Sequence, residues 1–188
     1  MSGMMSNSPR KIFNAWDGKG LPAGERHIGE VGQSLVISSV TVLVDLAADY
    51  AALDYCGTPS TLLSFANAAR VAGGKGCVRS AMFVDRGDVE APVSLILFST
   101  TTVSTTLTDN GALVVDDRDV DLIVGVISCA TTDYRDLNTS QVAWKKDQNI
   151  YFDLPGTTTT LYGLVQADGA WNAGAANDLG ISLQIEQF

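Results

Sequence analysis

Histidine is nearly absent from this sequence, since His27 is the only one among 188 residues. A serine or cysteine nucleophile normally needs a neighbouring base, and histidine is the usual one. His27 lies in a glycine-rich segment beside Arg26, where we expect a surface or interface residue rather than a general base. Sequence motifs for serine hydrolases, zinc proteases, phosphate loops and dinucleotide binding are also missing. We therefore expect no enzymatic activity, no catalytic residues and no cofactor.

Cysteine is scarce and odd in number. Cys56, Cys77 and Cys129 are widely spaced, with no CxxC pair and no set of ligands that includes histidine. This pattern favours three free, largely buried thiols over a disulfide framework or a zinc site. We expect a reducing compartment and no metal.

Long apolar runs and excess positive charge are missing as well. No stretch reaches the roughly 18 to 20 uncharged apolar residues of a membrane helix. The N-terminus has no apolar core followed by a small-residue cleavage site, so no secretory signal is indicated. The net charge of -9 and the sequence pI near 4.4 repel nucleic-acid phosphates. We expect synthesis in a cytoplasm and partners that are neither membrane nor nucleic acid.

The charge and the glycines divide the chain into two parts. Residues 1–30 carry four basic and three acidic side chains, a balance of +1, which leaves -10 for residues 31–188. Residues 1–33 have no sustained apolar period and are rich in glycine, but they include the large apolar side chains of Phe13 and Trp16. We predict an extended N-terminal arm over 1–33 that lies along a partner, and a folded domain over 34–188.

The domain over 34–188 shows the pattern of an all-β protein. Two apolar runs, 77–85 and 91–99, flank a polar link and predict a hairpin, and 142–145 with 150–154 predicts a second pair of strands. The run 91–99 is apolar on both sides, which indicates a strand covered on both faces. About eight or nine such strands, separated by turn residues, predict a β-sandwich, with a jelly roll as the preferred topology. Further strands are expected from Leu35 onward and over 62–65, 123–130, 161–167 and 181–188.

The acidic stretch 116–122 resembles the opening of a calcium loop, because carboxylates occupy alternating positions. The pattern then fails, since Leu122 stands where glycine is needed and Ser128 where a bidentate glutamate is needed. We favour a solvated, helix-starting acidic turn. Paired carboxylates of a glycoside hydrolase are a weaker possibility, because turn chemistry explains the acidic residues at predicted turns. These residues are Asp85, Asp88, Glu90, Asp133, Asp136, Asp153 and Asp168.

Aromatic side chains in the second half of the domain raise a different function. Tyrosine and tryptophan in loops stack on sugar rings, although core or interface packing explains them better. The alternative function is therefore a receptor-binding or glycan-binding module. Its candidate residues are Tyr134, Trp144, Tyr151, Tyr162 and Trp171.

Several segments between residues 27 and 188 form a distinctive pattern of structural residues. The most distinctive is the NAAR-x-x-GG-x-G turn with its following strand, within LSFANAARVAGGKGCVRSAMFVD (63–85). The others are HIGEVG (27–32), VSLILFST (93–100), LTDNGAL (107–113), DDRDVDLIVGVIS (116–128) and LYGLVQADG (161–169). Read in this order, they resemble a family of small tailed-bacteriophage virion proteins of the head decoration, or cement, type. In such a virion, the alternative receptor-binding or glycan-binding module would belong to a tail fibre or baseplate.

The resemblance implies a jelly-roll sandwich on the capsid surface that stabilises the head by bridging coat subunits. The partners would be the major capsid protein and two further copies of the chain in a homotrimer. A flexible arm with cationic and aromatic side chains suits contact with the shell. The expected interface residues are Arg10, Lys11, Phe13, Trp16 and His27.

Overall fold

The structure is a computed structural model that describes residues 34–42, 49–101, 104–173 and 178–188. All of them belong to the second of two units of the chain, Gln33–Phe188. The predicted arm over 1–33 lies outside the described residues, and so do its interface candidates Arg10, Lys11, Phe13, Trp16 and His27.

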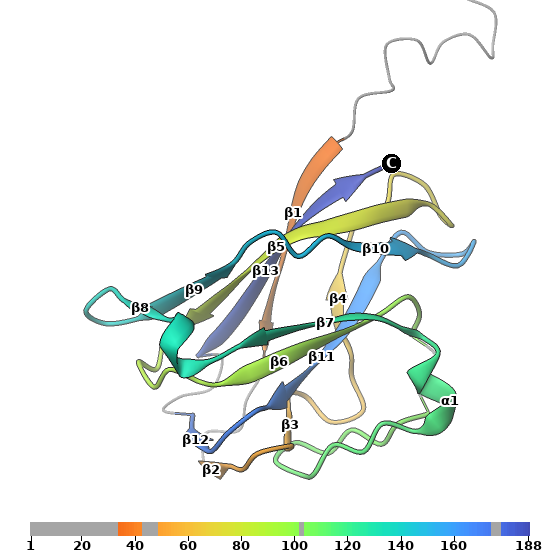
Figure 1. The fold of residues 1–188 in the computed structure, drawn as a ribbon. Coiled ribbons are helices and arrows are strands. Elements are labelled where there is room, and N and C mark those ends of the chain that lie inside the picture. The colour runs from red at the N-terminus through yellow and green to blue at the C-terminus, as the bar shows by residue number, and fades with distance from the viewer. Residues whose placement is uncertain (1–33, 43–48, 102–103, 174–177) are drawn as a thin grey trace, which may run out of the picture. The chain divides into compact units, whose positions relative to one another are not determined.

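Two antiparallel sheets form the described domain (Figure 1). Sheet I has the order β1-β13-β5-β9-β8, and β10 also pairs with β5. Its strands are β1 (Ser34–Val42), β5 (Lys75–Asp85), β8 (Arg135–Asp136), β9 (Gln141–Lys145), β10 (Ile150–Asp153) and β13 (Leu179–Gln187). Sheet II has the order β3-β11-β6-β7, and β4 also pairs with β11. Its strands are β3 (Tyr55–Cys56), β4 (Leu63–Phe65), β6 (Val93–Phe98), β7 (Ile123–Cys129) and β11 (Leu161–Ala167).

The remaining elements are short. β2 (Asp49–Tyr50) pairs with β12 (Trp171–Asn172), and one helical turn each is formed by α1 (Asp117–Val120) and the 3₁₀ helix η2 (Thr131–Asp133). The predicted helix-starting acidic turn over 116–122 is confirmed as α1, and the Asp116 side chain caps it by accepting a hydrogen bond from the Arg118 N–H. The expectation that the whole turn is solvated is wrong, because Asp119 is buried.

The order of the strands is that of a jelly roll. The chain passes from sheet I (β1) to sheet II (β3 and β4), returns to β5, and crosses again to β6 and β7. It then returns to β8, β9 and β10, crosses to β11 and ends in β13 between β1 and β5. Two sheets linked in this way form the two Greek keys of a jelly-roll sandwich. The predicted all-β sandwich with jelly-roll topology is confirmed.

The predicted hairpin of 77–85 and 91–99 is wrong, although both strands exist. β5 lies in sheet I and β6 in sheet II, so the link between them crosses the sandwich. Asp85, buried at the end of β5, fixes this crossing because its carboxylate accepts three backbone hydrogen bonds from the link. The donors are Gly87 at 2.9 Å, Val89 at 3.2 Å and Ala91 at 3.2 Å.

The predicted pairing of 142–145 with 150–154 is also wrong. β9 and β10 both pair with β5, β9 along residues 81–85 and β10 along residues 75–78, so they follow one another on the same edge. Between them, Asp147 and Asn149 have φ of 57° and 50°, a left-handed conformation that these two residue types tolerate. The two short runs are one strand position of the jelly roll, interrupted by four residues.

The core lies between the two sheets, and a second apolar layer covers sheet II on its other face. All six residues of β6 are buried, which confirms the prediction of a strand covered on both faces. Ile96 and Phe98 pack on that outer side against Leu107 and Leu113. The segment 104–122 therefore covers sheet II, whereas β13 of sheet I alternates between buried and half-buried positions.

Candidate binding surfaces

The cysteines are placed as structural residues. Cys56, Cys77 and Cys129 are buried and unbridged, which confirms the prediction of free, buried thiols. Burial raises the pKa of Cys56 and Cys77, and it raises the pKa of Cys129 to about 11. Because the thiolate is the nucleophilic form, these side chains are poorly suited to attack a substrate at neutral pH.

The acidic residues at α1 and its N-cap have different hydrogen-bond partners. The Asp116 side chain accepts a hydrogen bond from the Arg118 backbone and pairs with its guanidinium at 3.0 Å. Asp119 is buried, and its carboxylate accepts hydrogen bonds from the backbone N–H of Thr105 at 2.6 Å and from the Thr105 hydroxyl at 2.7 Å. Within the described ranges, no group of three or more histidine, cysteine or acidic side chains is arranged to hold a metal ion.

Most of the carboxylates considered for glycoside hydrolysis have structural partners. Asp133 accepts hydrogen bonds from the Ala130 backbone and the Lys145 ammonium, both at 2.8 Å. Asp168 accepts a hydrogen bond from the Ser94 hydroxyl at 2.7 Å. Similar bonds engage Asp85, Asp88, Asp136 and Asp153. These contacts support the interpretation that the carboxylates organise turns and strand ends.

Four of the five aromatic candidates for sugar stacking divide into two groups, and the fifth, Tyr162, is half-buried on β11. Trp171 is buried and stacks on Tyr50 with a centroid distance of 4.8 Å. The Tyr134 hydroxyl donates to the Ala91 carbonyl at 2.9 Å. Trp171 and Tyr134 therefore make their contacts within the domain, in line with the core packing that the sequence favoured for them. Trp144 and Tyr151 are exposed on sheet I.

The outer face of sheet I collects large exposed apolar side chains. Directly paired residues share one face of an antiparallel sheet, and Ile181, Leu183 and Ile185 of β13 fill the core side. The alternate residues Ser182, Gln184 and Glu186 face outward, so their partners on the neighbouring strands face outward as well. On this face Leu35 pairs with Glu186, Ile37 with Gln184, Trp144 with Met82 and Tyr151 with Cys77.

We call this surface the aromatic face and define it by Leu35, Ile37, Trp144, Tyr151 and Phe188. Their side chains are exposed, from 43% for Phe188 to 75% for Ile37. Tyr151 and Phe188 stack with a centroid distance of 6.2 Å. Large exposed apolar side chains gathered on one face of a sheet are a feature of interaction surfaces, although here the polar side chains of Gln184 and Glu186 lie between some of them.

Cationic side chains hold the rings of this face in place. The Arg79 guanidinium lies 5.9 Å from the centre of the Tyr151 ring and forms an ion pair with Glu186. The Lys146 ammonium lies 5.4 Å from the centre of the Trp144 ring. Cation–π contacts at exposed sites contribute about 0.5 to 1 kcal/mol each and so favour the orientations in which the two rings lie.

Sheet I is electrically neutral in an acidic domain. Its strands and the link 146–149 carry five basic and five acidic side chains. The strands of sheet II carry none. The charge of -10 therefore resides in the connecting segments. The residues counted for sheet I are Lys75, Arg79, Arg135, Lys145 and Lys146 against Asp85, Asp136, Asp147, Asp153 and Glu186.

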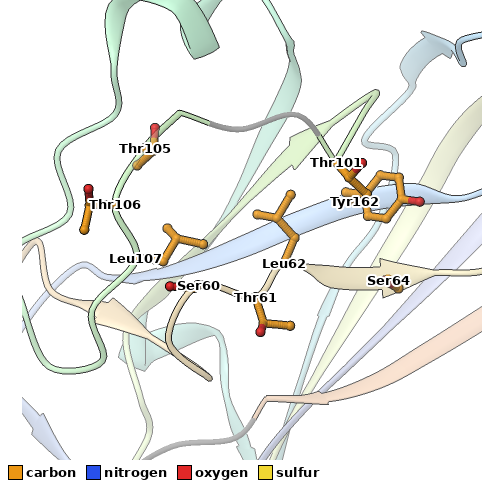
Figure 2. Close-up of a pocket in the computed structure, with 9 residues that line it drawn as sticks. All are labelled: Ser60, Thr61, Leu62, Ser64, Thr101, Thr105, Thr106, Leu107 and Tyr162. Carbon is orange, nitrogen blue, oxygen red and sulfur yellow. The ribbon is translucent and has the colours of Figure 1, made fainter.

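A second surface feature is a groove on the outer side of sheet II, with a volume of about 530 Å³. Figure 2 shows it between the segment that leads into β4, the strand β11 and the segment 104–107. Its apolar lining consists of Leu62, Leu107 and Tyr162. Its hydroxyl lining consists of Ser60, Thr61, Ser64, Thr101, Thr105 and Thr106. Of these nine residues, only Tyr162 was a candidate from sequence.

Neither the aromatic face nor the groove was predicted from the sequence as a complete surface. The sequence did contain a signal for the aromatic face. Leu35 and Ile37 are both large and apolar, and the period of a strand places them on the opposite side from Val36. The groove has no such signal, since it joins three segments that are distant in the chain.

In the part of the chain that the structure describes, no helix is long and apolar enough to cross a membrane.

Comparisons with known proteins identify no family for this chain. No protein-family model matches the chain, and no curated protein matches it. Among solved structures, the chain is similar to one from the structure of a marine algae virus of the order Picornavirales, with 12% identity over 82% of this chain and 68% of that chain. The TM-score of 0.20 does not establish a shared fold.

Proposed function

We propose that this protein is a non-enzymatic virion structural protein of a tailed bacteriophage, a decoration subunit that stabilises the head by bridging coat subunits. The observation that carries the proposal is the aromatic face, a neutral sheet surface that none of the described residues covers, on an otherwise acidic domain. The jelly roll and the resemblance of the segments between 27 and 188 support it. Jelly rolls also serve other functions, so the fold alone is a weak argument.

The charge distribution supports docking through the aromatic face. A domain with a net charge of -10 approaches a large partner at the lowest electrostatic cost through its neutral side. The face includes Trp144 and Tyr151, and tryptophan and tyrosine are among the residue types that contribute most of the binding energy at protein interfaces. Sheet II is the less suitable side, because the segment 104–122 already covers its outer face.

Many copies on one shell need only modest affinity each. A subunit that touches two coat subunits, or that belongs to a homotrimer, gains avidity because every further contact is intramolecular once the first has formed. In this proposal the aromatic face contacts the shell. The arm, with Arg10, Lys11, Phe13, Trp16 and His27, extends the attachment to a neighbouring subunit.

The proposal is tested by incubating the purified full-length chain with phage heads that lack decoration and by sedimenting the heads. We expect saturable binding, heads that resist higher temperature, and a trimer in light scattering coupled to gel filtration. A strictly monomeric chain that does not sediment with the heads would contradict the proposal.

A further inference from the structure

The groove on sheet II has a lining without ionisable acids or bases at neutral pH. Its polar groups are hydroxyls, and Leu62 and Leu107 supply apolar surface beside them. A lining of this kind offers nothing to neutralise a charged ligand, and the acidic domain around it repels anions. The chemistry matches a ligand that is itself uncharged and rich in hydroxyl groups.

Several of the lining hydroxyls are available. The Thr105 hydroxyl is occupied, since it donates to Asp119 and accepts from the Asp116 backbone. The hydroxyls of Ser64 and Thr106 are exposed and have no hydrogen-bond partner within the described ranges. Each unpaired hydroxyl is both a donor and an acceptor, which is the capacity that a polyol requires.

Tyr162 adds an apolar platform. It is half-buried on β11, directly opposite Phe98 of β6, and its ring belongs to the groove (Figure 2). An aromatic ring has one apolar body and one polar tip. A sugar ring has the same division, because its C–H groups form an apolar face and its hydroxyls lie around the edge. A sugar ring that stacks its C–H face on Tyr162 therefore presents its edge hydroxyls to the hydroxyl groups that line the groove.

The walls of the groove are held in place before any ligand arrives. The Ser60 backbone N–H donates to the Leu107 carbonyl at 3.0 Å and so ties the two walls together. The Tyr55 hydroxyl donates to the Thr61 carbonyl at 2.7 Å. Buried Asp119 fixes Thr105 from behind. Preorganised walls reduce the entropy lost on binding.

We propose that this groove binds an uncharged saccharide, one or two sugar rings in size. A volume of about 530 Å³ lies within the range of small-molecule sites, roughly 300 to 1,000 Å³. The inference goes beyond capsid decoration and does not depend on it. On a decoration subunit, such a site would give the virion surface a weak attachment to neutral glycans, multiplied by the number of copies.

The test uses the full-length chain on an array of neutral and charged glycans, followed by calorimetric titration of the best neutral saccharide. Thr106→Val with Ser64→Ala removes two hydroxyls from exposed positions, and we expect affinity to fall about tenfold or more. Thr132→Val is the matched control, since it makes the same change at an exposed threonine of η2, and it should bind like the wild type.

Three outcomes would overturn the inference. They are the absence of binding to any neutral saccharide at millimolar concentration, binding confined to charged glycans or to serine-rich and threonine-rich peptides, and equal affinity for the wild type and the groove variant. The assay contains no phage heads, so its failure leaves the decoration proposal untouched and the reverse also holds.

Discussion

Asp119 of α1 holds Thr105 by two hydrogen bonds, from the backbone N–H at 2.6 Å and from the hydroxyl at 2.7 Å. The Asp119 side chain is buried, and Thr105 lines the hydroxyl groove. This contact fastens the segment 104–122 over sheet II, and with it the apolar layer that includes Leu107 and Leu113. One carboxylate therefore supports both the covering layer and one wall of the groove.

Removing this carboxylate should weaken the fold. Asp119→Ala leaves the N–H and the hydroxyl of Thr105 without their acceptor in a buried place, and we expect a loss of about 3 kcal/mol in the free energy of unfolding. Urea denaturation measures it. Asp117→Ala, at an exposed position of the same helical turn, is the control and should change stability by less than about 0.5 kcal/mol. Equal losses in the two variants would contradict the assigned role.

Acid should destabilise the domain through the same group. Burial opposes ionisation of Asp119, but hydrogen bonds from Ser104 and Thr105 outweigh it and lower its pKa. The hydrogen bond from Lys145, with one from the Ala130 backbone, lowers the pKa of Asp133. A lowered pKa in the folded state stabilises the protein above the unfolded pKa, about 3.9 for aspartate, and this contribution disappears as the pH falls through the folded pKa.

We therefore expect the free energy of unfolding to fall as the pH drops below about 4. Urea titrations at a series of pH values should show a smaller acid dependence for Asp119→Asn than for the wild type. An unchanged pH profile in that variant would mean that the lowered pKa of Asp119 contributes nothing to stability.

The sequence predicted the strands better than their partners. Alternation placed Ile181, Leu183 and Ile185 on the core side of β13 correctly, because the side-chain period of a strand is set locally. Partner choice depends on the links. The link 86–90 looked like a hairpin loop, but three hydrogen bonds to Asp85 redirect the chain into the other sheet. No local pattern distinguishes these two outcomes.

Gly76, the second residue of β5, offers a stability test of packing. A Cβ at Gly76 would lie 2.5 Å from Cζ of Phe152, 3.0 Å from the Ala68 carbonyl oxygen and 3.1 Å from that of Glu186. We expect Gly76→Ala to cost about 1 to 3 kcal/mol by overpacking. Thermal unfolding measures the loss.

Gly156→Ala is the matched control for this substitution. A Cβ at Gly156 meets no atom within 4 Å, so that variant should unfold like the wild type. Adding Phe152→Leu to Gly76→Ala should recover part of the loss, since it removes the nearest clash. A fully stable Gly76→Ala protein would show that the close approach of Phe152 to β5 at this position is not required.

Deleting residues 1–26 tests the proposed division of work between arm and domain. We expect the truncated chain to stay folded by circular dichroism and to bind undecorated heads more weakly, because the arm residues Arg10, Lys11, Phe13 and Trp16 are removed. Unfolding of the truncated chain at ordinary temperature would instead make the arm part of the core.

The binding surfaces were harder to predict than the fold, for a physical reason. Exposure depends on what covers a strand, and a single sequence does not show that 104–122 covers sheet II while the described residues leave sheet I open. Trp144 and Trp171 look alike in sequence, yet one lies on the aromatic face and the other stacks on Tyr50 in the core. Only the tertiary arrangement separates them.

The most direct test of the central claim is the affinity of the double variant Trp144→Ala, Tyr151→Ala for undecorated phage heads, measured by co-sedimentation. Both side chains are more than half exposed, at 57% and 62%, so the fold should survive their removal. Val114→Ala is the control, an apolar side chain that is 74% exposed on the segment that covers sheet II. The account predicts at least a tenfold loss for the double variant, typical of paired aromatic anchors, and none for the control. Wild-type affinity in the double variant would contradict docking through the aromatic face.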